Sequence, residues 1–202
     1  MSKHPEDEPG KEAGKENSPL GESAFTPEQR HALERKGYFI YRLTGQSITT
    51  LRDAGHPFWS NLSGSTRFKI ETISSLHTEV AINPQRLFLP NSNKRTMDVQ
   101  LAMVAEFSEE IGREVHGTVA ILGNDSDYAE VVFAHFTHTR QLLFEAKDAF
   151  DISNYTRTTT RIGGPSFVIV GGLDKNHGLF VSRMDCDEGR GNVWAAPLVV
   201  PA

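Results

Sequence analysis

The sequence predicts an α+β fold: a single domain, with a mixed β-sheet, helices packed on it and a C-terminal antiparallel meander. Over the first three quarters of the chain, stretches with helical spacing alternate with short apolar runs. From residue 154 onward, short β-prone runs separated by turn residues remain. The length of 202 residues suits one domain with its own core.

The N-terminal segment, residues 1–24, is predicted to be a disordered acidic tail. It holds three lysines and six acidic residues, and Leu20 is its only large aliphatic side chain after Met1. Such a segment has too little apolar surface to offset the entropy lost on ordering. The folded domain is therefore placed at residues 25–202.

Residues 26–95 are predicted to contain both helices and strands. Thr26 followed by Pro27, with Gln29 three residues after Thr26, is a helix start, and Gly37 marks the end of that helix. A second helix is expected from residue 47 to about 58. Strands are predicted at residues 38–43, 67–73 and 80–89.

A long amphipathic helix is predicted from Met97 to Val115, with Leu101 and other apolar residues on one stripe. The apolar run 118–122 then predicts a central strand covered on both faces, in which Val119 and Ile121 are buried. A further helix is expected over residues 127–144.

The C-terminal quarter is predicted to be an antiparallel meander. Pro197 cannot donate a hydrogen bond to a neighbouring strand, so the last run is expected at a sheet edge. The four β-prone runs are residues 155–162, 166–170, 179–182 and 193–200.

The composition excludes several functional classes. Cys186 is the only cysteine, so an intrachain disulfide is impossible, and no apolar run approaches the ~20 residues of a membrane span. These features predict a cytoplasmic protein without membrane contact. The net charge of −5 makes nucleic acid an improbable partner.

Charge is distributed unevenly along the chain. Residues 26–95 hold ten basic and five acidic side chains, whereas residues 96–151 hold three basic and eleven acidic side chains. These segments pack together, form solvated helix faces or present a bipolar surface to a partner.

A short acidic pattern occurs twice near the C-terminus and allows two interpretations. Asp174 and Asn176 precede Gly178, and Asp185 and Asp187 precede Gly189 with the same spacing. Alternating oxygen ligands before a glycine suit a divalent cation such as Ca²⁺. Asp and Gly also form ordinary turns, which is the favoured interpretation, and no other cofactor is expected.

A second candidate site is the acidic turn that follows the predicted central strand. Ligands in open sheets lie beyond the carboxyl ends of strands, so Asp125 and Asp127 stand where a pocket is expected. Their negative charge favours a cation or a hydroxylated ligand over a phosphate, and plain helix capping is the favoured interpretation.

Two further pairs have the spacing of a binding site. Arg157 and Arg161 would lie on one face of a strand and present two guanidinium groups to an anion, or form a charged strand face. His135 and His138 are three residues apart on a helix, but no third zinc ligand is evident, so surface histidines are the simpler interpretation.

These observations predict a small cytoplasmic domain that binds a protein or a small molecule without catalysis of its own. The alternative is a hydrolase assisted by a divalent cation, with Asp125 and Asp127 joined by Asp174, Asp185 or Asp187. This alternative requires the aspartates to lie within ~6 Å of one another in a concave pocket.

Overall fold

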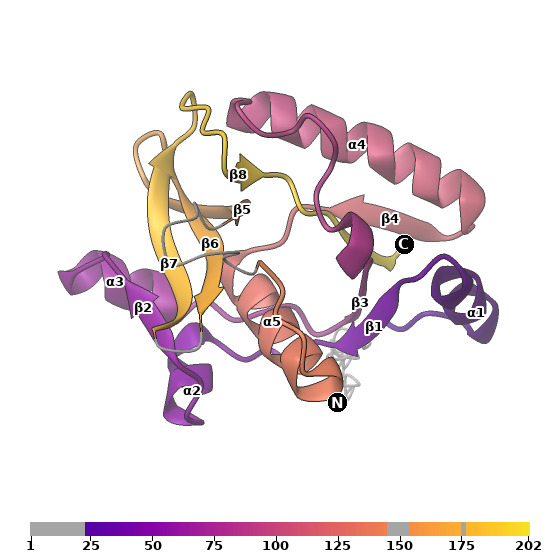
Figure 1. Ribbon diagram of the computed structural model, residues 1–202, viewed down its shortest axis with the longest axis horizontal. Coiled ribbons are helices and arrows are strands. Elements are labelled where there is room, and N and C mark those ends of the chain that lie inside the picture. Colours follow the sequence, from indigo (N-terminus) through magenta and orange to yellow (C-terminus); the bar gives the residue numbers. More distant parts are fainter. Residues whose placement is uncertain (1–22, 145–153, 175–176) are drawn as a thin grey trace, which may run out of the picture.

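Two β-sheets with a helix packed between them form the centre of the molecule (Figure 1). The computed structural model describes residues 23–144, 154–174 and 177–202. It confirms the α+β class and divides the single mixed sheet of the prediction into two sheets. Almost all of the predicted tail lies outside the described residues.

The first sheet has four strands in the order β1-β3-β9-β4, and all of its pairings are antiparallel. Helices α1 (Pro27–Arg35) and α4 (Met97–Glu114) cover one face, with Leu33 and Ile111 in the core beneath them. Helix α5 (Asp125–Thr139) covers the other face. The strands are β1 (Phe39–Arg42), β3 (Glu79–Ile82), β4 (Thr118–Ile121) and β9 (Leu198–Pro201).

The second sheet has five strands in the order β2-β7-β6-β5-β8. The meander β5-β6-β7 is antiparallel as predicted, while β2 and β8 add parallel strands at its two edges. The strands are β2 (Phe58–Ser60), β5 (Tyr155–Gly163), β6 (Ser166–Asp174), β7 (Gly178–Asp185) and β8 (Val193–Trp194).

Local sequence signals explain where the helices begin. The Thr26 hydroxyl accepts a hydrogen bond from the backbone of Gln29, which completes the predicted capping box of α1. Ser47 caps α2 in the same way. The helices are α1 (Pro27–Arg35), α2 (Ile48–Asp53), α3 (Gly64–Glu71), α4 (Met97–Glu114) and α5 (Asp125–Thr139), with a short 3₁₀ turn at Pro84–Arg86.

Helix α5 is the core helix that both sheets share. Ten of its 15 residues are buried, so it has no continuous solvent face in its first turns. Val131 and Val132 belong to a core cluster that also contains Val80 of β3 and Val168 of β6. Helix α5 thereby fixes the position of one sheet relative to the other.

Two predicted strand positions in the first sheet are wrong. β4 is an edge strand, and Val119 and Ile121 are half-buried, while Ala120 between them is buried under α4. The central place belongs to β9, which the sequence predicted at an edge. Pro197 precedes β9 and Pro201 ends it, so neither proline interrupts the pairing of the strand interior.

Three local predictions also differ from the structure. Residues 67–73, predicted as a strand, lie mostly in α3. Leu101 of α4, predicted on the buried stripe, is exposed. Its neighbour Gln100 is buried instead and donates hydrogen bonds to two backbone carbonyls. β6 continues to Asp174, beyond the predicted end at residue 170, and Gly171 within it is a glycine because a Cβ there would stand 2.3 Å from the carbonyl oxygen of Asn154.

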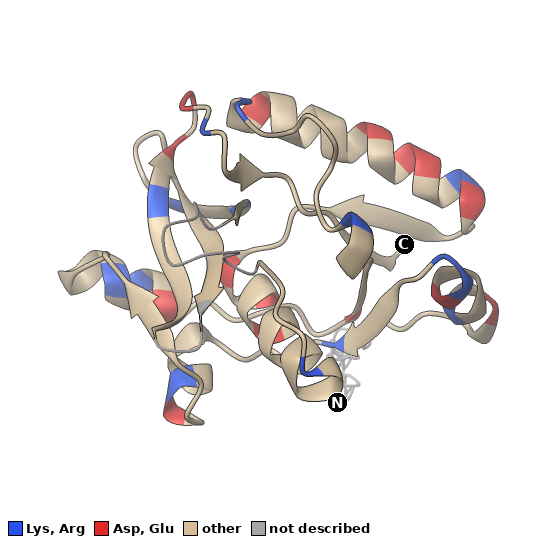
Figure 2. Ribbon diagram, in the orientation of Figure 1, with Lys and Arg blue, Asp and Glu red and all other residues tan. Residues whose placement is uncertain are grey.

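The basic and acidic segments meet where Lys36, at the end of α1, forms an ion pair with Glu114 of α4 at 2.8 Å. Other acidic side chains of α4 are exposed along its outer face, and basic residues of α2 and α3 lie on the far side of the molecule (Figure 2). These other groups form solvated helix faces. Among the described residues, no helix combines the length and apolar character that a bilayer span requires.

Candidate functional site

The predicted acidic turn forms the first turn of α5. Asn124 is the N-cap, and Asp127 completes a capping box with it, so the helix begins at Asp125, two residues before the predicted start at residue 127. The Asp127 carboxylate accepts hydrogen bonds from the backbone N–H groups of Leu76 and Asn124, both at 2.7 Å. Burial outweighs these bonds and raises the pKa of Asp127 to about 6.

Asp125 lies beside Asp127 but connects to the second sheet. The Thr160 hydroxyl donates to its Oδ1 at 2.5 Å, and Oδ2 is buried without a hydrogen-bond partner among the described residues. Burial is the main cause that raises the pKa of Asp125 to about 6. Both aspartates are closed off from solvent and hold neighbouring segments of the chain, so the structure favours the capping interpretation.

Arg157 and Arg161 do not form a common anion site. The ladder between β5 and β6 shifts register between these two residues, which breaks the alternation that would place them on one face. Arg157 is fully buried, and its guanidinium donates to the carbonyl oxygens of Asp185 at 2.9 Å and Glu188 at 2.7 Å. Arg161 is exposed and lies over the ring of Phe167.

The two acidic repeats lie at opposite ends of one hairpin. Asp174 pairs with Gly178 beside the β6–β7 turn, whereas Asp185 pairs with Ser166 at the other end of β7. Seven residue steps along a strand separate these ends by roughly 23 Å, so one ion cannot reach both. Asp187 is exposed in the turn after β7, and Asn176 lies outside the described residues.

The described aspartates therefore do not meet the condition set for the hydrolase alternative. Within the described part of the chain, no three histidine, cysteine or acidic side chains are grouped as a metal site would require.

The two histidines of α5 have different environments. His138 is exposed, as predicted, but His135 is only 1% exposed. The Tyr41 hydroxyl lies 2.6 Å from Nδ1 of His135, and burial lowers the pKa of His135. The sequence placed His135 at the helix rim because it could not show that β1 crosses this part of α5.

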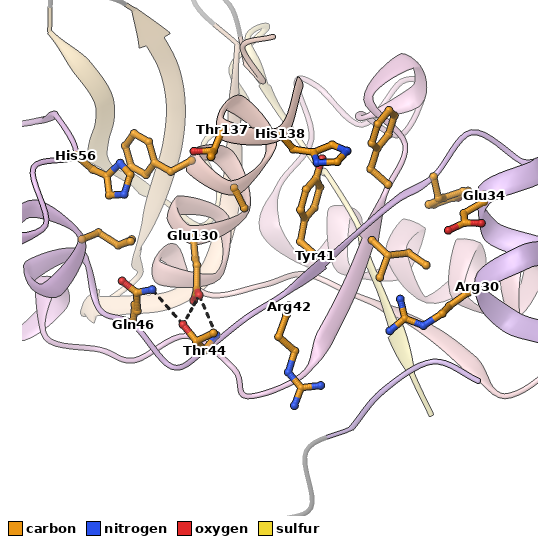
Figure 3. Close-up of a pocket in the computed structure, with 16 residues that line it drawn as sticks. Arg30, Glu34, Tyr41, Arg42, Thr44, Gln46, His56, Glu130, Thr137 and His138 are labelled. Carbon is orange, nitrogen blue, oxygen red and sulfur yellow. Dashed lines mark hydrogen bonds between the residues drawn. The ribbon is translucent and has the colours of Figure 1, made fainter. Parts of the chain in front are cut away.

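A cleft of about 970 Å³ lies along the edge of β1 (Figure 3). All four residues of β1 line it. One wall comes from α1, with Arg30 and Glu34, and the other from α5. The α5 wall and the adjoining α2–β2 segment contribute His56, Glu130, Phe133, Ala134, Thr137 and His138.

The floor of the cleft is the open edge of a β-strand. The Leu43 N–H donates to the Thr78 carbonyl at 2.8 Å, opposite it in the register of β1 and β3. Backbone groups of an antiparallel strand alternate in direction, so those of Tyr41 also face β3 and those of Ile40 face away from it. Among the described residues, no strand pairs with this outer edge.

One end of this edge is closed by a side chain. Thr44 follows β1, and its outward N–H and its hydroxyl both donate to Oε1 of Glu130, at 2.9 and 2.7 Å (Figure 3). The other carboxylate oxygen of Glu130 accepts from Ser75. Glu130 thereby stands where the carbonyl of a neighbouring strand would stand.

The walls of the cleft are mainly aromatic on the α5 side. His56 stacks on Phe133 with ring centroids 4.3 Å apart, and burial lowers the pKa of His56. His138 packs edge-on against Phe39 and Tyr41. Phe39 is 38% exposed, so apolar surface is available at the mouth of the cleft.

No pattern in the sequence predicted this site. The sequence predicted the strand at residues 38–43, but the cleft combines residues from five separate segments. Its defining feature is the outer edge of β1, which pairs with no described strand. No short motif encodes such a feature.

Comparison with known proteins gives no relative of this chain. No family model, curated protein or solved structure matches it.

Proposed function

We propose that this protein is a binding domain that takes up an extended polypeptide segment in the cleft along β1. The observation that carries the proposal is the outward-facing backbone of Ile40, which meets no described strand although it lies in the floor of this cleft. An extended peptide adds to such an edge through main-chain hydrogen bonds. A cytoplasmic location is part of the proposal, supported by the single cysteine.

The walls define which peptide would fit. Side chains of an added strand alternate in direction, so one set would face α1 and the other α5. The α5 side offers the rings of Phe133 and His138 to apolar or aromatic residues, while Glu34 on α1 offers a charge and Arg30 is already paired with Glu79. The cleft volume falls within the range of about 300–1,000 Å³ found for ligand sites.

The test is selection of peptides from a random twelve-residue library on the full-length protein, followed by affinity measurement on two variants. Ile40→Pro removes the outward N–H and fills its place with the ring, and proline is tolerated on an open edge. Ile40→Ala also shortens the side chain but keeps the N–H, so it is the matched control. Circular dichroism establishes that both variants are folded.

The expected result is a loss of about tenfold or more in affinity for Ile40→Pro and little change for Ile40→Ala, as one lost hydrogen bond and a steric block predict. Selection that yields no peptide would overturn the proposal. Selected peptides that bind both variants with equal affinity would also overturn it. So would selected peptides whose affinity depends on no residue of β1.

A further inference from the structure

We propose that the outer face of the five-stranded sheet binds a neutral saccharide, with one sugar ring stacked on Trp59 and the hydroxyl groups of a neighbouring ring bonded to polar side chains of the sheet. This face shares no lining residue with the cleft along β1, so the inference is independent of the proposed function. It rests on the order of side chains across the sheet, on a small cavity and on the charges around that cavity.

The outer face is the side of the sheet that points away from α5. Leu179 and Val181 of β7 belong to the core cluster that contains the buried residues of α5. Side chains alternate in direction along a strand, so Phe180 and Ser182 point to the opposite side. These two side chains therefore mark the outer face.

An aromatic row crosses this face. The register aligns one residue from each of four neighbouring strands: Trp59 of β2, Phe180 of β7, Gly171 of β6 and Tyr155 of β5. The rings of Trp59 and Phe180 stack with centroids 4.3 Å apart, and Tyr155 meets Phe180 edge-on at 5.7 Å. Trp59 is still 53% exposed, so the row offers a flat apolar surface to a ligand.

Polar side chains lie beside the aromatic row. Asn61 and Ser182 each follow a member of the row by two residues, and both line a cavity of about 220 Å³ together with Phe180 and Tyr155. Ser182 is only 5% exposed, and its hydroxyl has no hydrogen-bond partner among the described residues. Buried hydroxyl groups normally have a partner, so a hydroxyl of a bound ligand would complete this one.

The size of the cavity limits what enters it. About 220 Å³ is less than the ~300–1,000 Å³ of sites that enclose a whole drug-sized ligand. A single ring of the ligand therefore enters the cavity beside Tyr155, and an adjoining ring lies on Trp59. A chain of at least two sugar rings fits this arrangement.

The charges around the cavity do not favour an ionic ligand. Among the described residues that line it, Arg190 alone carries a charge, and it forms an ion pair with Glu188 at 2.6 Å. Arg157 lies farther along the same face, but it is fully buried and its guanidinium donates to backbone carbonyls. A saccharide needs no cation, because its ring faces are apolar and its hydroxyl groups are neutral.

The test is binding of the full-length protein to an array of neutral oligosaccharides of glucose, galactose, mannose, xylose or N-acetylglucosamine. Isothermal titration calorimetry then measures the affinity of the best ligand for Trp59→Ala and Ser182→Ala. The matched control is Phe68→Ala, because Phe68 is also an exposed aromatic residue but belongs to α3. Ile40→Pro is a second control that blocks the cleft along β1, and circular dichroism establishes that all variants are folded.

Trp59→Ala should weaken binding about tenfold or more, because the stacking surface is lost. Ser182→Ala should weaken it about fivefold, because one hydrogen bond to the ligand is lost. The urea midpoint of Ser182→Ala should not fall, since the hydroxyl has no partner among the described residues of the unbound protein. Phe68→Ala and Ile40→Pro should bind the oligosaccharide like the unmodified protein.

Absence of binding to every oligosaccharide at millimolar concentration would overturn this inference, and so would equal affinity in Trp59→Ala and the unmodified protein. A single-stranded oligonucleotide that binds through Trp59 in place of a saccharide would overturn it in favour of a nucleic-acid surface. Self-association that Trp59→Ala abolishes, without saccharide binding, would assign the face to a second copy of the chain. The proposed function is unaffected by these results, because its own test depends on Ile40.

Discussion

Asp125 should make the protein more stable in mild acid than at neutral pH. Its side chain is fully buried, Thr160 supplies one hydrogen bond, and burial raises its pKa to about 6. An unfolded aspartate has a pKa of about 3.9. The folded protein therefore binds the proton more tightly than the unfolded chain does.

The pKa difference sets the size and direction of the effect. About two units correspond to roughly 3 kcal/mol of unfolding free energy. This contribution is complete below the unfolded pKa, decreases as the pH rises through about 4 to 6, and is lost above the folded pKa. Between pH 7.5 and pH 4.5 the expected gain is about 2 kcal/mol.

The assay is urea unfolding of the unmodified protein and Asp125→Asn at several pH values between 4.5 and 7.5. Other carboxylates affect both proteins alike, so the difference between the two free energies of unfolding isolates Asp125. That difference should move by about 2 kcal/mol in favour of the unmodified protein as the pH falls. A difference that stays constant across this range would refute the assignment of a raised pKa to burial.

Three further predictions concern the packing around the two sheets. Arg157→Met should lower the free energy of unfolding in urea by ~3 kcal/mol or more, because backbone carbonyls lose their donors. Arg161→Met should change it by less than ~1 kcal/mol. Equal losses would contradict a stabilising role for the hydrogen bonds of Arg157. Gly178→Ala should destabilise more than Gly164→Ala, since both have positive φ but a Cβ at residue 178 would stand 2.2 Å from a carbonyl oxygen; equal melting temperatures would argue against the close contact. Tyr41→Phe should cost about 1 kcal/mol by leaving the buried imidazole of α5 without a partner, and an unchanged urea midpoint would count against that bond.

Local signals in the sequence were sufficient for several elements. Thr26, Pro27 and Gln29 are close in sequence, and the capping box that they form depends on no distant residue. The glycine-rich turn before Ser166 likewise specifies the β5–β6 hairpin. The order of the meander follows from such short connections, which is why β5, β6 and β7 were placed correctly.

Strand position within a sheet depends on partners that are distant in the sequence. The run 118–122 is apolar because α4 and the core cover its two faces, and this pattern does not show whether a strand has one neighbour or two. Similarly, residues 67–73 alternate like a strand, but the Arg67–Glu71 ion pair has helical spacing and Glu71 also binds Arg52 of α2. The structure is decided there by tertiary contacts.

The candidate site residues also combine features that nearby residues determine with features that distant residues determine. Asp125 and Asp127 were correctly placed at a strand end followed by a helix, because that order is local. Their burial and their bonds to Leu76 and Thr160 are not local. The role of Arg157 was missed for a related reason: a register shift between Arg157 and Arg161 breaks the alternation of β5, and no residue type signals the shift.

The two edges of the four-stranded sheet differ in how they are covered, and this contrast supports the proposal that β1 binds a peptide. At β4, the outward N–H of Ala120 donates to the hydroxyl of Ser108 on α4 at 2.8 Å, so a helix covers that edge. At β1, Glu130 closes the edge beside Thr44 but does not reach Ile40. Proteins usually protect exposed strand edges because open ones promote aggregation. An edge left open between two helical walls, in a molecule that seals its other edge, is therefore expected to have an occupant.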